Sequence, residues 1–319
     1  MQTDKPDTQI MQNKFRIAII GIGGVGGFYG GKLAQKYAAS EEHEIIFIAR
    51  GEHKEKINST GLLLDYAGDQ ETIKPDLVTD DLQSLGKLDL VLFSVKSYSL
   101  HTVAQALKSS ITVQTYLLPL LNGVESIEYL SRLYPQSKLL WGCTYIISSV
   151  AAPGKVKVQG KLNRLVWGNP ALATEELQTV KQVLDDAGIH NELYENIKDK
   201  VWEKFSFISP LATFTSYTNQ PAGNILGQPE LTEQLRTLIQ ELKAVADAKQ
   251  IHLPADIVEK NIQLLQKFPK DTTSSMHRDY QNHNQTELEN LTGYIVREGE
   301  KEGIATPFYK KIYEKLKES

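Results

Sequence analysis

The stretch that most constrains the fold runs from Phe15 to Gly26 and reads FRIAIIGIGGVG. Its apolar first half is typical of a strand buried on both faces. Glycines follow at the spacing G-x-G-x-x-G, and the segment from Val25 to Tyr37 predicts a helix. In this strand–turn–helix context the glycines permit a tight turn, close approach of a pyrophosphate and close helix packing. The alternative is a purely structural glycine turn. The predicted cofactor-binding residues of the turn are Gly21, Gly23, Gly24, Val25 and Gly26.

Length and composition suggest a two-domain protein without nucleic-acid or membrane partners. A chain of 319 residues fits about two domains, and its hydrophobic content of 41% can fill two cores. A formal net charge of −4 does not favour nucleic acid or an anionic membrane. Residues 1–13 are polar and predict a disordered tail, not a secretory signal. No apolar run approaches the roughly 20 residues of a membrane span. With Cys143 as the only cysteine, a cytoplasmic protein is expected.

The second predicted strand, Glu44 to Ala49, points to the type of cofactor. It ends at Arg50. In NAD-binding folds an acidic residue near this point holds the ribose 2′-hydroxyl, whereas an arginine suits a 2′-phosphate. Arg50, helped by Lys54 or Lys56, therefore favours NADPH. The alternative is a solvated arginine at the start of a loop.

Two later strands deliver polar side chains to the carboxyl edge of the predicted sheet, where open parallel sheets bind ligands. The strand Leu88 to Val95 is followed by Lys96, which is expected to face cofactor or substrate unless it merely ends the strand. The strand Thr115 to Leu121 is followed by Asn122, whose amide suits a nicotinamide or a substrate. The alternative for Asn122 is an ordinary Asn-Gly turn.

The remaining pattern divides the chain into an α/β part and an all-α part. Further strands are expected at 62–66 and 73–79, as an inserted antiparallel hairpin, and at 138–150, 155–159, 164–167 and 190–194. From Ile197 onward strand signals stop, and leucines between 231 and 242 recur at helical spacing. We expect a mostly parallel Rossmann-type domain over residues 14–194 and an all-helical domain over residues 195–319.

The helical half carries the candidate groups for carbonyl reduction, which needs a donor beside the developing oxyanion. Lys204 in VWEKF is such a donor; its alternative is a solvated helix lysine. Ser274 and Ser275 suit a substrate carboxylate, or else simply cap a helix. Glu287 could orient a substrate hydroxyl or pair with the lysine; its alternative is a surface charge.

Other reactive side chains are assigned structural roles. Cys143 is expected to pack in the core, because no base or cation accompanies it in the sequence. His277 and His283 lack metal-ligand spacing and are assigned to the surface or an interface. No metal site is predicted.

From about Phe15 to Lys315 the chain resembles the ketopantoate reductases, the 2-dehydropantoate 2-reductase family. The N-terminal half of the resemblance comprises GIGGVG, Arg50-Gly51, Gly61-Leu62, VLFSVKSYSL with Lys96 and LLNGVES with Asn122. The C-terminal half comprises VWEKF with Lys204, TSSMHRD with Ser275 and Asp279, and Thr286-Glu287. The twelve-residue step from Ser275 to Glu287 fits the spacing of the family.

The resemblance implies NADPH-dependent reduction of 2-dehydropantoate (ketopantoate) to (R)-pantoate, on the way to pantothenate and coenzyme A, in a cleft between two domains. It implies Lys204 as the proton donor and Glu287 as its acidic partner near the substrate oxygen. Ser275 matches the serine that binds the substrate carboxylate. Lys96 and Asn122 match cleft residues near both cofactor and substrate, and Arg50 matches the arginine for the 2′-phosphate.

One departure from the family pattern concerns substrate contacts. The pattern has asparagines four and eight residues after the lysine and another in the following loop, and this chain has instead Ile208, Ala212 and Ala222. Either Ser209, Thr213 or Asn219 holds ketopantoate here, or the substrate is a different, more apolar 2-oxo acid. A non-catalytic NADP-binding sensor is the third alternative. The sequence leaves homodimerisation open.

Overall fold

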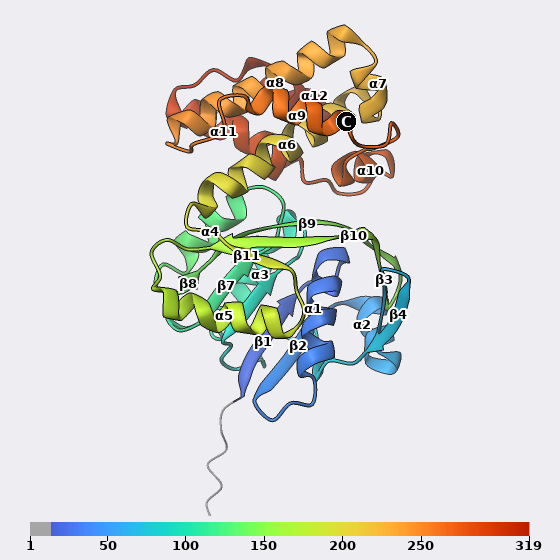
Figure 1. The fold of residues 1–319 in the computed structure, drawn as a ribbon, viewed down its shortest axis with the longest axis vertical. Coiled ribbons are helices and arrows are strands. Elements are labelled where there is room, and N and C mark those ends of the chain that lie inside the picture. Colours follow the sequence, from blue (N-terminus) through green and yellow to red (C-terminus); the bar gives the residue numbers. More distant parts are fainter. Residues whose placement is uncertain (1–13, 319) are drawn as a thin grey trace, which may run out of the picture.

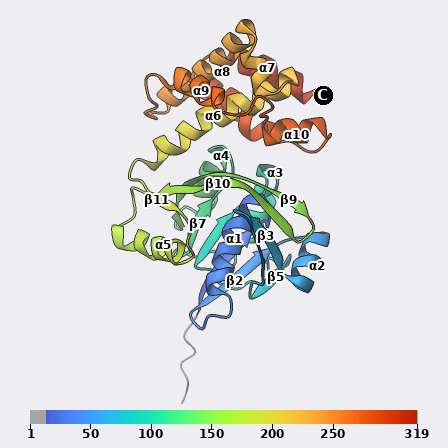
Figure 2. The same ribbon diagram turned by 45° about the vertical axis from the view of Figure 1, so that its right-hand side comes forward.

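The computed structural model describes residues 14–318, so the predicted disordered tail lies outside the described residues. An α/β domain with a parallel sheet is followed by a helical domain, which confirms the predicted fold class (Figure 1). The helical domain lies over the side of the α/β domain that strands β9 and β10 cross, and helix α6 contacts both strands (Figure 2).

The main sheet has the strand order of a doubly wound dinucleotide-binding domain. Its six strands follow the order β5-β2-β1-β6-β7-β8, and every neighbouring pair is parallel. This is the order 3-2-1-4-5-6 of that fold, with its switch point between β1 and β6. The strands are β1 (Phe15–Ile20), β2 (His43–Ile48), β5 (Leu77–Thr79), β6 (Leu90–Phe93), β7 (Tyr116–Pro119) and β8 (Lys138–Leu139).

Both faces of this sheet are covered, which explains why its strands are uniformly apolar. Along β1, Ile17 and Ile19 join the core formed with α1, whereas Ala18 and Ile20 join the core formed with α3 and α4. The helices of this domain are α1 (Gly24–Tyr37), α2 (Gly51–Thr60), α3 (Ser97–Ala106), α4 (Glu125–Leu133) and α5 (Thr174–Asp186).

A second sheet of five strands packs against α1. It has the order β11-β10-β3-β4, with β9 paired to β10. The predicted strands at 155–159 and 164–167 are one strand, with an irregularity between Gln159 and Asn163. The five strands are β3 (Leu62–Tyr66), β4 (Asp69–Ile73), β9 (Trp141–Ala152), β10 (Lys155–Gly168) and β11 (Asn191–Leu193).

The predicted hairpin of 62–66 with 73–79 is wrong in its second arm. Strand β3 pairs with β4, which ends at Ile73, and residues 77–79 form β5 in the main sheet. Pro75 offers no N–H to a ladder, so the hairpin cannot extend through it. The Asp76 carboxylate instead accepts the N–H groups of Ala39 and Ile45, which directs the chain to the edge of β2.

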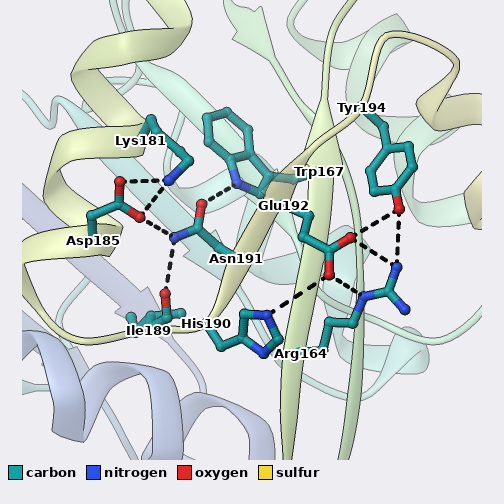
Figure 3. A network of polar contacts seen from close by, with 9 residues as sticks. All are labelled: Arg164, Trp167, Lys181, Asp185, Ile189, His190, Asn191, Glu192 and Tyr194. Atoms are coloured by element: carbon teal, nitrogen blue, oxygen red, sulfur yellow. Dashed lines mark hydrogen bonds and ion pairs between the residues drawn. The ribbon is translucent and has the colours of Figure 1, made fainter.

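A polar network fixes the edge of the second sheet just before the chain enters the helical domain (Figure 3). Asn191 on β11 accepts the indole N–H of Trp167 at 3.0 Å and donates to Asp185 of α5 at 2.8 Å. Arg164 on β10 donates to Glu192 on β11 at 3.0 Å. These contacts tie α5, β10 and β11 together, so helix α6 starts from an ordered base.

The helical domain is built around α6 (Ile197–Thr218), which packs against α8, α9, α10 and α12. The predicted leucine stripe lies on α8, where Leu235, Leu238 and Leu242 are buried. The other elements are α7 (Ala222–Leu226), α8 (Pro229–Ala248), α9 (Ile257–Gln266), α10 (Ser275–Gln281), the π-helix η1 (Glu289–Gly293), α11 (Tyr294–Glu302) and α12 (Pro307–Lys317). Within residues 14–318, no helix combines the length and apolarity needed to span a membrane.

Candidate active site

A cavity of about 1290 Å³ lies between the two domains. Its α/β side consists of the glycine turn, the carboxyl ends of β2, β6 and β7, and parts of β9 and β10; α6, α9 and α10 form its helical side. Nearly all predicted site residues line it: Gly21, Gly23, Gly24, Val25, Arg50, Lys96, Asn122, Lys204, Ser275 and Glu287. The exception is Gly26, which lies beneath the turn.

The glycine turn has the shape that a dinucleotide requires. A side chain at Gly26 would collide with the Gly21 carbonyl oxygen and the Ser94 hydroxyl, so only glycine fits there. Ser94, at the end of β6, donates to the Gly21 carbonyl at 2.8 Å and fixes the turn. The turn leads directly into the N-terminus of α1, whose free N–H groups suit a pyrophosphate.

Arg50 immediately precedes α2 and is exposed at the cleft. Its guanidinium forms no ion pair with any residue in the range 14–318, so it is available to an anion. Lys54 and Lys56, which were suggested to help Arg50, do not line the cavity. The ammonium of Lys54 binds the Asp80 carboxylate at 3.0 Å instead.

Lys204 of α6 points across the domain boundary. Its Nζ donates to Asn122 Oδ1 at 3.2 Å and lies 5.7 Å from the centroid of the Tyr145 ring. Burial lowers the pKa of the Lys204 ammonium, and Cys143 and Glu287 only partly offset that effect. The solvated-lysine alternative is therefore wrong, and Lys204 is suited to give up a proton.

Glu287 is held by the α/β domain. Its carboxylate accepts the N–H of Ser97 at 3.1 Å and lies 3.7 Å from Lys96 Nζ, which also pairs with Asp279 at 2.8 Å. Burial works against the charged form of Lys96, but Glu287 and Asp279 outweigh it and raise the pKa of this ammonium. The lysine that pairs with Glu287 is thus Lys96, whereas the sequence suggested Lys204.

Two residues that the sequence analysis missed complete the lysine's surroundings. Tyr145 on β9 lies beneath Lys204, as described above. Asn290, on the π-helix η1, donates to the main-chain oxygen of Asn122 at 2.6 Å and is buried. π-Helical turns often mark functional sites, but they have no clear sequence signal.

Ser274 and Ser275 both line the cavity, and Ser274 also caps a helix. Ser274 is the N-cap of α10, and its hydroxyl accepts the N–H of His277 at 2.9 Å. Ser275 is the first residue of that helix and lines the cavity, where its hydroxyl can meet a carboxylate.

The reactive side chains assigned to structure behave differently from one another. Cys143 is buried and free, and burial raises its thiol pKa, as expected for a packing residue. The surface or interface role predicted for His277 is wrong. It is buried, because Thr273 and Asn219 supply hydrogen-bond partners for both ring nitrogens. The described residues contain no cluster of side chains suited to a metal ion.

The positions that depart from the family pattern form part of the cavity wall. Ile208 and Ala212 line it, whereas Ala222 is buried elsewhere. The proposed substitutes do not line the cavity. Ser209 donates to the Leu291 carbonyl at 2.7 Å and Thr213 bonds Thr292 at 2.7 Å. Asn219 accepts from His277 and Gln281. The suggestion that these three hold the substrate is therefore wrong.

Fold and cleft together define a nicotinamide-dinucleotide-dependent oxidoreductase, with a dinucleotide-binding domain and a lysine-bearing helical domain. The chain belongs to the ketopantoate reductase family. Residues 17–171 match the family model "Ketopantoate reductase PanE/ApbA", and residues 196–319 match its C-terminal counterpart.

Similar proteins cover nearly the whole chain. The uncharacterized oxidoreductase YkpB of Bacillus subtilis (strain 168) is 25% identical over 302 residues, which are 94% of this chain and 97% of that protein. The structure of 2-dehydropantoate 2-reductase from Porphyromonas gingivalis W83 is 31% identical, with a TM-score of 0.82 and coverage of 95% and 99%. That of a PanE/ApbA family ketopantoate reductase from Ralstonia eutropha JMP134 is 28% identical, with a TM-score of 0.85 and coverage of 95% and 97%.

Proposed function

We propose that this protein reduces a 2-oxo acid to a 2-hydroxy acid with NADPH, and that 2-dehydropantoate, reduced to (R)-pantoate for pantothenate and coenzyme A synthesis, is its first candidate substrate. The observation that carries the proposal is Lys204. Its ammonium is partly buried at the domain boundary, bound to Asn122, and its pKa is lowered. The choice of 2-dehydropantoate as the candidate substrate rests on the family. The proposed location of the protein is the cytoplasm.

The residues of the cleft can divide the work of the reaction. Lys204 donates the proton that the carbonyl oxygen takes up as it becomes a hydroxyl, and Asn122 keeps the Lys204 ammonium in place. Ser275 and Lys96 provide a donor and a positive charge for the substrate carboxylate. Glu287, held by Ser97 and Lys96, provides an acceptor at the substrate oxygen.

The cofactor would be held by the glycine turn, with Arg50 at its adenosine end. When bound, it supplies the hydride for the carbonyl carbon. A 2′-phosphate would give the exposed Arg50 guanidinium the partner that residues 14–318 do not supply, and this supports NADPH over NADH.

Steady-state NADPH oxidation with 2-dehydropantoate and other 2-oxo acids tests the proposal. We expect turnover of at least one 2-oxo acid, faster with NADPH than with NADH at equal concentration. Tight NADPH binding without turnover of any 2-oxo acid would refute the proposal and favour the sensor.

A second candidate function is reduction of a more apolar 2-oxo acid. It is favoured by Ile208 and Ala212, which line the cavity without polar groups. Burying a substrate hydroxyl against such a wall without a partner costs about 1–3 kcal/mol. In the same assay, this candidate predicts faster turnover of apolar 2-oxo acids than of 2-dehydropantoate.

A further inference from the structure

Pro210 lies inside α6 and leaves one main-chain carbonyl of that helix without its usual donor. In an α-helix the carbonyl of Ser206 would accept the N–H of residue 210, which proline lacks. Asn261 of α9 replaces that donor. Its Nδ2 donates to the Ser206 carbonyl oxygen at 2.9 Å and to the Ser206 hydroxyl at 3.0 Å.

These contacts fix which way the Asn261 amide faces. The Ser206 carbonyl can only accept, so the nitrogen of the amide must face it. The Ser206 hydroxyl gives its hydrogen to the Glu203 carbonyl at 2.7 Å and therefore accepts from Asn261. Both amide hydrogens are used on α6, and Oδ1 points away from Ser206.

The free oxygen belongs to a buried side chain at the cleft. Asn261 is 6% exposed and lines the cavity together with Ile208 and Leu264. Among residues 14–318 no donor reaches its Oδ1, although the oxygen is not sealed from the cavity. An acceptor that faces the cavity without a donor from the protein can take a hydrogen bond from a ligand, and that bond gains strength as the ligand excludes water.

We propose that Asn261 is a specificity-determining residue, whose Oδ1 accepts a hydrogen bond from a hydroxyl on the side chain of the 2-oxo acid. This rests on the proposed function and narrows its substrate class to hydroxylated 2-oxo acids. Asn261 of α9 then accepts the hydrogen bond that the apolar side chains of Ile208 and Ala212 on α6 cannot accept. A site built to bond a hydroxyl disfavours the analogue that lacks it.

The discriminating pair is 2-dehydropantoate and its deoxy analogue, 3,3-dimethyl-2-oxobutanoate, which differ only in the side-chain hydroxyl. We expect wild-type kcat/KM to favour the hydroxylated acid at least roughly tenfold. Asn261→Leu should remove most of this preference, chiefly by slowing the hydroxylated acid.

Asn261→Leu also deprives the Ser206 carbonyl of its donor, so the test is repeated in a Pro210→Ala background. Alanine at 210 restores a main-chain N–H for Ser206 and makes the amide of Asn261 dispensable for the helix. If Asn261 were only structural, Pro210→Ala would restore the preference lost in Asn261→Leu. We expect the double variant to fold but to remain unselective. Asn224→Leu, at an exposed position outside this cavity, is the matched control.

Binding separates this inference from the proposed function. Titration calorimetry with NADP⁺ and either acid should show the same preference and the same loss in the double variant. No turnover of any 2-oxo acid would refute the function, while a preference in binding that needs Asn261 would sustain the inference. The inference about Asn261 would be overturned if the wild type bound both acids equally. It would also be overturned if the double variant kept the wild-type preference for the hydroxylated acid.

Discussion

Arg50 and Lys204 show at the scale of single residues how environment decides the chemistry of a cation. Arg50 is exposed at the cleft and forms no ion pair among residues 14–318. Lys204 lies where burial lowers the pKa of its ammonium. The first is suited to hold a phosphate and the second to release a proton.

Arg50→Ala should weaken NADPH binding much more than NADH binding. Only NADPH carries the 2′-phosphate that the guanidinium would bond, and a lost charge-assisted bond costs roughly 1.5–3 kcal/mol, or about 10- to 150-fold in Kd. Fluorescence titration of both cofactors measures the effect. Lys54→Ala is the matched control, because Lys54 pairs with Asp80 outside the cleft. Equal weakening of both cofactors by Arg50→Ala would refute the assignment.

The pH dependence of turnover should report the lowered pKa of Lys204. A proton donor is active in its acid form, so kcat should fall as pH rises through a pKa below the ordinary lysine value of 10.5. Asn122→Asp would place a carboxylate in contact with the ammonium and raise this pKa, shifting the alkaline limb to higher pH. A limb that stays in place in Asn122→Asp would argue against Lys204 as the titrating group.

At the scale of elements, the π-helix η1 and the turn after β7 position the site together. Gly123 has φ of +88°, and a side chain there would lie 2.7 Å from Asn290 Nδ2. Glycine at this position therefore permits the positive φ of the backbone and leaves room for Asn290 to reach Asn122. Ser209 and Thr213 bond Leu291 and Thr292 of η1 from α6.

Gly123→Ala should lower both stability and turnover. A non-glycine residue at positive φ costs about 1–3 kcal/mol, and the added methyl group would push Asn290 away from Asn122. Gly188→Ala is the control, because φ is +64° there and nothing lies within 4 Å of an added Cβ. Urea unfolding should show a lower free energy of unfolding in both variants, whereas kcat should fall only in Gly123→Ala. An unchanged kcat in Gly123→Ala would show that this contact does not position the site.

The sequence predicted those elements whose signals are local. The strand–turn–helix at Gly21 and the leucine stripe of α8 follow from spacing alone, and both are present. The second sheet was harder to predict, because β10 pairs not only with its neighbour β9 but also with β3 and β11, which lie far from it in the sequence.

The site residues that the sequence predicted also had local signals. Lys96 and Asn122 were predicted because they follow buried strands. Tyr145, Asn261 and Asn290 were not, because their roles depend on what faces them across the cleft. The burial of His277 likewise depends on Asn219, a partner 58 positions away in sequence.

At the scale of the whole molecule, ion pairs and hydrogen bonds join α4 to the helical domain. Arg297 of α11 pairs with Glu125 at 2.8 Å. Lys249, just after α8, lies 3.3 Å from Glu128 and also pairs with Glu298. These contacts act with Lys96 and Glu287 to set how the two domains meet. The only exposed large hydrophobic side chain in the described helical domain is Leu264, which lines the cleft.

Lys249→Met should lower the free energy of unfolding at neutral pH by roughly 1–3 kcal/mol, because it removes the less exposed of the two lysines that pair with Glu298 and the one lysine that pairs with Glu128 among the described residues. Burial works to raise the pKa of Glu298, but Lys249 outweighs it and the net pKa is lowered. A lowered carboxyl pKa stabilises the fold above the unfolded pKa, and this contribution is lost as pH falls through the folded value. The difference in the free energy of unfolding between wild type and Lys249→Met should therefore become smaller at acidic pH.

Urea unfolding at neutral and acidic pH measures this effect. Lys301→Met is the control, because the side chain of Lys301 is 64% exposed and its pair with Glu298 is expected to contribute little. A difference in the free energy of unfolding that grew as the pH fell would contradict the stabilising role assigned to the ion pairs of Lys249.

The most direct test of the central claim is single-turnover NADPH oxidation by wild type and Lys204→Ala, with the best 2-oxo acid from the panel. Loss of the proton donor should slow the step roughly 10²- to 10⁴-fold, while the Kd of NADPH stays the same. Lys198→Ala, on the same helix at an exposed position outside the cleft, should behave as wild type. Oxidation at the wild-type rate in Lys204→Ala would contradict the claim that Lys204 protonates the substrate in this cleft.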